Sequence, residues 1–459
     1  MKNTNIISNI LSYAFISLAF PLATASLSAQ GVSTVDYYLR GNSGYTPLTQ
    51  ENSLQYWSLT RDEYTAPESL PGADAMVIID RVNTNGSSTL TFARGDFHKP
   101  TTYYAIRATV NTELNMTAQL SLVGDFTINA RSEYSSADPN IKQLRLVSQT
   151  ADFFTVGGDM ILSTDKYFTT RFSLYRSTSM KVGGALQFDW NGSLSDTGYH
   201  AFDMSDANKN STGTLFTINL GGLVSNNRAV YMTSTHSLTS NFVFSNDSSG
   251  AFKGGSFEGV FATQDSVSST ANFSMNGSGR QSITIYKAAN AAAHGIAVIG
   301  GRNDMTIGEV SVSSGELIFN SELAVNSVLL DGGSLKLTAS EGVGDFTINA
   351  GSLVYGGPLK VGNLTVAAVD EVKVVFSAED LASQYLVIMD YGYLTDAFDP
   401  DAIFVAYDES GNRLGGTFAL EEFSGGSGSL VYTVPEPAAY AAIFAMAAVA
   451  AAFARRKRK

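Results

Sequence analysis

The chain has 459 residues, no cysteine, 44% hydrophobic residues and a formal net charge of −13. This acidity disfavours nucleic acid and anionic lipid as partners, and it leaves divalent cations and neutral glycans as better candidates. Because there is no cysteine, disulfides are excluded, and we expect hydrophobic burial and continuous hydrogen-bonded sheet to stabilise the fold.

Residues 1–29 are predicted to be a secretory signal peptide. Lys2 supplies the positively charged start, and Ile10 to Leu22 form the apolar core. Small residues then fit the cleavage pattern, which places the cut at Ala25 or at Ala29. We therefore expect signal peptidase and the secretion machinery as partners. The alternative is an uncleaved N-terminal anchor.

Residues 30–100 are predicted to be an N-terminal cap region. The segment is irregular and aromatic, with Tyr37-Tyr38 and Tyr56-Trp57, and a Pro71-Gly72 turn precedes a strand at Met76 to Ile79. A cap would cover the open end of a hydrophobic core. The alternative is that exposed aromatic rings stack on sugars.

Residues 101–380 show short β-branched and aromatic runs separated by Gly, Ser, Asn and Asp, which predicts an all-β body. The octapeptide at 123–130 recurs without change at 343–350, and two Gly-Gly units follow similar strands at 154–158 and 180–184. Repeated short strands with glycine corners predict a parallel β-helix, a solenoid with irregular loops. β-Sandwich or jelly-roll domains are the alternative.

The stretch from Arg302 to Asp370 has the most regular strand cores, among them Leu317 to Phe319, Val328 to Leu330 and Leu335 to Leu337. This stretch resembles the autotransporter-associated β-helix repeats of bacterial surface proteins. It departs from them in one respect, because no run of long amphipathic strands that could build an outer-membrane barrel follows it. Transport through a barrel of its own is therefore not expected.

Residues 381–433 are predicted to be a C-terminal β cap and linker. Tyr385 to Met389 reads as a strand, Asp408 to Asn412 as a hairpin turn, and Leu430 to Thr433 as a last strand. The Gly-Ser segment at 425–428 is predicted to be a flexible hinge before the tail.

Residues 434–459 combine three blocks. Pro435, Glu436 and Pro437 form an extended triplet that cannot lie inside a helix. An Ala-rich apolar run follows and predicts a single transmembrane helix, and a basic cluster after it is expected to stay cytoplasmic. The helix residues that we single out are Ala438, Ile443, Phe444, Met446, Val449 and Phe453, and the basic stop is Arg455, Arg456, Lys457, Arg458 and Lys459.

This tail resembles a PEP-CTERM sorting signal, which occurs on exported proteins of Gram-negative bacteria that often make exopolysaccharide. The resemblance covers only the C-terminal block. It implies an exosortase-like membrane protease as a partner that recognises Pro435 to Pro437. It also implies transient anchoring in the cytoplasmic membrane, followed by the cell surface or the extracellular matrix. A plain C-terminal anchor is the alternative.

Catalytic motifs are few. The four histidines, His98, His200, His236 and His294, are far apart in sequence and fit no zinc motif. The carboxylate pairs Asp203 with Asp206 and Asp399 with Asp401 are read as ordinary acidic loops. The segment at 203–210 has oxygen ligands for Ca²⁺ but lacks the central Gly and terminal Glu of an EF-hand loop. We therefore predict no catalytic, cofactor-binding or metal residue.

Together these features predict an exported structural or adhesin-like protein that is not an enzyme and that binds exopolysaccharide but no nucleic acid. The alternative is a polysaccharide-active β-helix lyase or hydrolase, since catalytic residues on such a scaffold converge from distant strands and leave no local motif.

Overall fold

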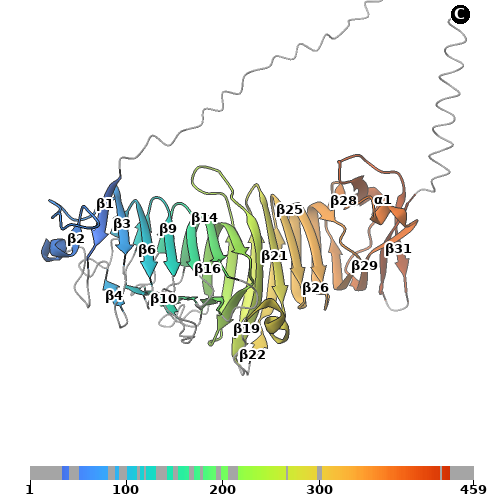
Figure 1. Ribbon diagram of the computed structural model, residues 1–459. Coiled ribbons are helices and arrows are strands. Elements are labelled where there is room, and N and C mark those ends of the chain that lie inside the picture. The colour runs from blue at the N-terminus through green and yellow to red at the C-terminus, as the bar shows by residue number, and fades with distance from the viewer. Residues whose placement is uncertain are drawn as a thin grey trace, which may run out of the picture.

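The structure is a computed structural model. It describes residues 34–40, 51–80, 88–91, 101–110, 114–117, 120–130, 142–147, 154–164, 170–175, 179–192, 198–204, 215–264, 267–296, 302–423 and 426–434. Strands dominate these residues and most of them pair in parallel within one large sheet, which confirms the all-β prediction. The molecule is elongated, and its strands follow one another along the long axis in chain order (Figure 1). The parallel pairing argues against the antiparallel sandwich that we kept as the alternative.

One set of parallel strands, which we call ladder A, extends along the whole body. Its strands align with little slippage, as where Phe126 pairs with Ile106 on one side and with Met160 on the other. Ladder A contains β1 (Val35–Leu39), β3 (Ala75–Asp80), β6 (Ala105–Val110), β9 (Phe126–Ala130), β12 (Met160–Thr164), the C-terminal parts of β14 (Ser179–Trp190) and β16 (Leu215–Asn226), the N-terminal part of β19 (Gly255–Gln264), β21 (Arg280–Tyr286), β24 (Glu316–Ser321), the C-terminal parts of β25 (Val325–Ala339) and β26 (Val343–Val354), β28 (Val372–Phe376) and β30 (Phe404–Asp408). Because β1 and β3 already belong to it, the sheet begins inside the segment predicted as a cap.

A second set, ladder B, lies beside ladder A and shares its longest strands. It contains β5 (Thr101–Tyr103), β8 (Leu120–Leu122), β11 (Phe154–Val156), the N-terminal parts of β14 and β16, β18 (Thr239–Phe244), β20 (Thr270–Met275), β23 (Thr306–Val312), the N-terminal parts of β25 and β26, β27 (Leu359–Val366) and β29 (Tyr385–Leu394). The corner between ladders B and A is often glycine. A Cβ atom at Gly183 would lie 2.4 Å from the carbonyl oxygen of Gly157, so only glycine lets successive corners stack this closely.

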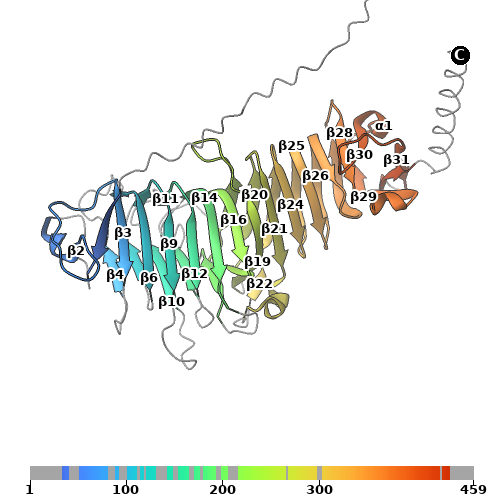
Figure 2. The ribbon, with the colours of Figure 1, turned by 45° about the horizontal axis from the view of Figure 1, so that its top comes forward.

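A third set, ladder C, covers only part of the length. It contains β4 (Ser88–Thr91), β7 (Leu114–Thr117), β10 (Lys142–Val147), β13 (Thr170–Tyr175), β15 (His200–Asp203), β17 (Val230–Ser234) and the C-terminal part of β19. Figure 2 shows β4 and β10 along one side of the body, with β19 near the place where this ladder stops.

The core is continuous from Tyr37 to Tyr432 and is built by alternation along each strand. In β18 every second side chain is buried, and the ring of Phe242 stacks on that of Phe273 with 5.1 Å between centroids. Alternation follows from the two-residue period of a strand, and each buried Phe contributes about 1.5–3 kcal/mol of apolar burial. The outward positions carry mostly Thr, Ser and Asn.

A buried side chain closes a gap in ladder A between β16 and β19. Gln281, which is fully buried, accepts a hydrogen bond from the Leu223 amide (3.0 Å) and donates one to the Leu223 carbonyl oxygen (2.8 Å). The side-chain amide of Gln281 therefore takes the place of a backbone partner for Leu223 in β16, which lies 58 positions earlier in the chain.

Short elements close the two ends. At the N-terminal end, η1 (Glu51–Tyr56) leads into β2 (Trp57–Ser58), which pairs antiparallel with β1, and Trp57 is fully buried against Tyr37. At the C-terminal end β32 (Gly428–Thr433) pairs antiparallel with both β29 and β31 (Thr417–Glu422). The remaining elements are η2 (Ala288–His294), β22 (Arg302–Asp304), η3 (Asp380–Ala382) and α1 (Pro400–Ile403).

The predicted hairpin turn at Asp408 to Asn412 is confirmed. The Asp408 amide donates to the Asn412 carbonyl oxygen (2.9 Å), and Tyr407 forms an antiparallel bridge with Arg413. Asp408 also accepts hydrogen bonds from the Asn412 amide and side chain, which lower the pKa of its carboxyl group.

Candidate functional site

The body changes its cross-section where ladder C ends. There β22 pairs antiparallel with β19, and among the described residues ladder C has no strand after it. From Thr306 to Val366 the chain alternates between ladders A and B alone, and equivalent residues lie 18 positions apart, as Asn363 and Asp345 do. The layers after them are longer, since Leu359 pairs with Met389 and Val372 pairs with Phe404. We call the place between β22 and β25 the step.

A short helix covers the outer side of ladder C at the step. The sequence Ala288 to His294 forms the 3₁₀ helix η2, which ends at Gly295 in the left-handed conformation (φ 77°). Alanine side chains suit this position because they let the helix approach the sheet closely. The second buried cluster that results contains Tyr199, Ala201, Ala229, Tyr231, Val260, Ala262, Ala288, Ala291 and Ile296.

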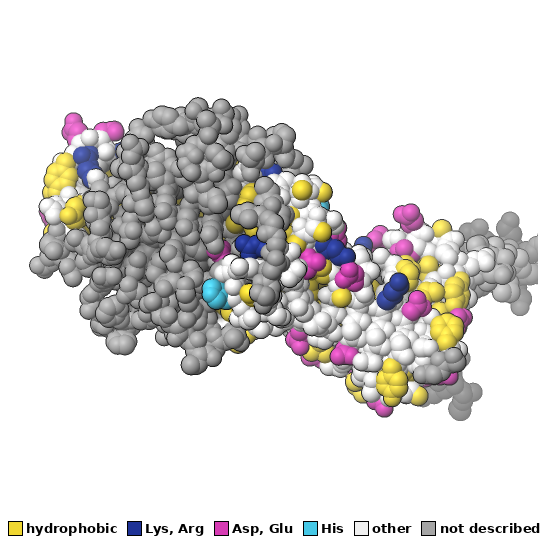
Figure 3. Space-filling model, turned by 90° about the horizontal axis from the view of Figure 1, so that it is seen from below, with side chains coloured by type: hydrophobic (Ala, Val, Ile, Leu, Met, Phe, Trp, Pro, Cys, Tyr) yellow, Lys and Arg dark blue, Asp and Glu magenta, His cyan; other side chains and the backbone are white. Residues whose placement is uncertain are grey.

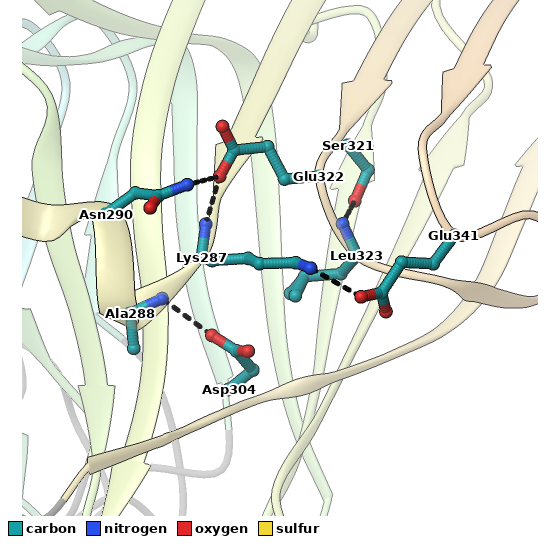
Figure 4. Close-up of polar contacts among 8 residues, drawn as sticks. All are labelled: Lys287, Ala288, Asn290, Asp304, Ser321, Glu322, Leu323 and Glu341. Carbon is teal, nitrogen blue, oxygen red and sulfur yellow. Dashed lines mark hydrogen bonds and ion pairs between the residues drawn. The ribbon is translucent and has the colours of Figure 1, made fainter.

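Carboxylates from three later segments anchor the start of η2 (Figure 4). Glu322 accepts hydrogen bonds from the Lys287 amide (2.8 Å) and from the Asn290 side chain (2.7 Å). Asp304 accepts one from the Ala288 amide (2.6 Å), and the Lys287 ammonium contacts Glu341 at 2.5 Å. These contacts satisfy helix amides that have no partner within the helix.

The ionisable groups at the step are held in their charged or hydrogen-bonded forms. The hydrogen bond with Glu341 raises the pKa of Lys287, and the same bond lowers the pKa of Glu341. Tyr286 donates to Glu258 (2.9 Å) and stacks on His294, and burial, followed by this hydrogen bond, raises its pKa to about 12. A carboxyl group with a lowered pKa is a poor general acid near neutral pH.

A groove of about 650 Å³ extends from the step toward the C-terminal end. Four corner segments line it, residues 324–326, 341–344, 360–362 and 390–392. Its floor is bare, because Gly344, Gly362 and Gly392 occupy equivalent corners. A Cβ atom at Gly344 would lie only 2.4 Å from the Asn326 carbonyl oxygen.

The polar groups of this groove come from neighbouring corners. Lys360 and Asp390 pair across β27 and β29, and Glu341 lies next to them on the corner before β26. Asp390 also accepts a hydrogen bond from the Ser429 hydroxyl (2.5 Å), which fixes its carboxylate. None of these polar residues was predicted from the sequence, where the recurrence of glycine at 344 and 362 is the signal that points to this place.

The described histidines contact different partners. His200 is buried beside Phe188 and its ring nitrogen Nε2 lies 3.0 Å from the Asp189 carbonyl oxygen, and burial lowers its pKa to about 4. His236 contacts Thr235 in a turn, and His294 ends η2. His98 lies outside the described residues.

The predicted acidic pairs have structural partners or lie partly outside the described residues. Asp399 caps α1 by accepting from the Asp401 amide (3.1 Å), and Asp401 accepts from the Phe418 amide (3.1 Å). Asp203 is buried at the end of β15, whereas Asp206 and the rest of the Ca²⁺ candidate from residue 205 to 210 lie outside the described residues. In the part of the chain that the structure describes, no three His, Asp or Glu side chains gather closely enough to hold a metal ion.

Both predicted sorting segments lie outside the described residues. These are the signal peptide at 1–29, with its cleavage at Ala25 or Ala29, and the tail from Pro435 to Lys459. Among the helices that the structure does describe, none is long and apolar enough to cross a bilayer.

Comparison with known proteins gave no match: no family model, no curated protein and no solved structure is similar to this chain at a significant level.

Proposed function

We propose that this chain is an exported surface or matrix protein that is not an enzyme, and that its body is a parallel β-helix presenting a long face to exopolysaccharide. The observation that carries this proposal is the outward surface of ladder B. Neutral side chains there stack from strand to strand and hydrogen-bond one another, as Asn272 does with Asn241 (2.9 Å) and Ser311 with Ser274 (2.9 Å).

Such columns repeat hydroxyl and amide groups at the strand spacing of about 4.8 Å. Hydroxyl and amide groups both donate and accept hydrogen bonds, so they suit the hydroxyl groups of a sugar polymer. In the view from below, the charged side chains on the described surface are scattered, and uncharged atoms cover a larger area between them (Figure 3). This favours a neutral glycan as partner, and it agrees with the acidic composition.

The β-helix proposal is supported by the pairing of each ladder in chain order and by the single continuous core. Strands that return in parallel at intervals as short as 18 residues leave little chain for any other connection. The sorting proposal rests on the sequence alone: export by the signal peptide, then an exosortase-like protease acting at Pro435 to Pro437.

Two measurements test the proposal. Cell fractionation with mass spectrometry of the mature C-terminus, with and without the sorting protease, should show a tail cut near Pro437; an intact Lys459 in the mature protein would remove the sorting proposal. Incubation with purified polysaccharides should leave their chain lengths unchanged. Rapid depolymerisation would instead favour the lyase or hydrolase.

Among the described residues, we place that enzymatic alternative at the step, because Glu322, Glu341 and Lys287 meet there. If it holds, depolymerisation should be lost in Glu341→Gln and retained in Glu316→Gln, a matched change on ladder A.

A further inference from the structure

We propose that the groove beyond the step binds a single chain of a linear, uncharged polysaccharide, in line with the long axis of the body. This proposal rests on the glycan-binding function above and assigns that function to one site. The site consists of the glycine floor, Asn326, Lys360 and Asp390, with Tyr393 at its side.

The shape of the groove favours a polymer. Its floor repeats once per layer, where a layer is one passage of the chain through ladders A and B, and its glycines expose backbone in place of side chains. Layers stack at the strand spacing of about 4.8 Å, so a ligand with repeated units meets equivalent corners in succession. A compact ligand would use one corner and leave the others unoccupied.

The chemistry of the groove fits sugar hydroxyl groups. Asn326 offers an amide, Lys360 three N–H donors and Asp390 a carboxylate, and a hydroxyl group can pair with each of them. The carboxylates of Asp390 and Glu341 are held in place, because the Ser429 hydroxyl donates to Asp390 and Lys287 pairs with Glu341. Side chains that are already fixed lose less conformational entropy when the ligand binds.

The charge of the groove argues against an acidic polymer. Glu341 and Asp390 are its carboxylates and Lys360 is its one cation among the lining residues, on a chain whose net charge is −13. A uronate or sulfate polymer therefore finds no excess of cations on this surface, and the net charge of the chain would repel it.

An exposed ring adds an apolar contact. Tyr393 lies in β29 opposite Asn363 of β27, and 53% of its surface is exposed. Part of its ring is therefore accessible to the apolar face of a sugar, and Tyr side chains are enriched at interfaces because they combine an apolar ring with a polar hydroxyl group.

The test uses the full-length chain in detergent micelles, a soluble linear neutral glucan and polygalacturonate of similar length. Asn326→Trp places an indole over the glycine floor, and Asn320→Trp makes the same change on ladder A, away from the groove. We expect calorimetry to show glucan binding that weakens at least about tenfold in Asn326→Trp and in Tyr393→Ala, and by less than about twofold in Asn320→Trp.

Three results would overturn it in distinguishable ways. Glucan binding that Asn326→Trp and Tyr393→Ala leave unchanged would refute the groove but keep the proposed function. Tighter binding of polygalacturonate than of glucan would refute the uncharged class. If the wild-type chain bound no glycan at all, the proposed function itself would fall.

Discussion

Replacement of Gln281 by Leu tests whether a side-chain amide holds ladder A together between β16 and β19. The substitution keeps most of the side-chain volume and removes three hydrogen bonds, to the amide and carbonyl of Leu223 and to the Ser282 carbonyl oxygen (3.0 Å). Leu223 and Gln281 are both fully buried, so water cannot replace the lost partner.

Each buried backbone group left without a partner costs about 1–3 kcal/mol, which gives about 2–6 kcal/mol for the two groups of Leu223. Hydrogen exchange of the Leu223 amide measures the free energy of this local opening directly. We expect its protection to fall by at least about 25-fold, because each 1.4 kcal/mol corresponds to a factor of ten.

Gln187→Leu is the matched control. Gln187 donates to Asp189 (2.8 Å) from the outward, half-buried side of β14, where water can replace the bond, so we expect a loss of less than about 1 kcal/mol. Equal losses in the two variants would refute the view that Gln281 substitutes for a backbone partner.

Three further predictions concern the core, the corners and one histidine. Phe242→Ala should lower the unfolding free energy by about 3–5 kcal/mol through the cavity it leaves, and an unchanged thermal midpoint would contradict the packing described. Gly344→Ala should lower the thermal midpoint because its Cβ meets the Asn326 carbonyl oxygen at 2.4 Å, whereas Gly356→Ala, with 3.3 Å to the nearest atom, should leave it nearly unchanged. Burial lowers the pKa of His200 from 6.5 to about 4, so the unfolded chain takes up the proton first as the pH falls. Stability should therefore fall by up to about 3 kcal/mol between pH 6.5 and pH 4, and urea titrations of His200→Gln should lack this component.

The sequence predicted the local structure of strands better than their place in the fold. The repeated octapeptide forms a glycine corner and then a strand with inward Phe and Ile in both copies, as expected. Yet Phe126 lies in ladder A and Phe346 in ladder B. Alternation of apolar residues reports which side of a strand is buried, whereas the ladder depends on how many strands each layer contains. That number changes at the step, and no local pattern marks the change.

The candidate site was less predictable for a related reason. Glu341, Lys360 and Asp390 lie on corners of three different layers, and only stacking brings them to one groove. The alanine run at 288–293 forms most of η2. Its use as a cover for ladder C depends on contacts with Tyr231 and Val260, which are distant in sequence.

The 18-residue layers beyond the step also bear on how the protein would respond to force. The hydrogen bonds between successive layers point along the long axis. A force that pulls the two ends of the chain apart therefore acts on the outermost layer first and reaches the next layer only after that one has opened. Once a layer opens it releases 18 residues, which extend to about 60 Å. The layers between Thr306 and Val366 would therefore lengthen in similar increments and dissipate work at each one, whereas the longer layers that follow would each release about 30 residues.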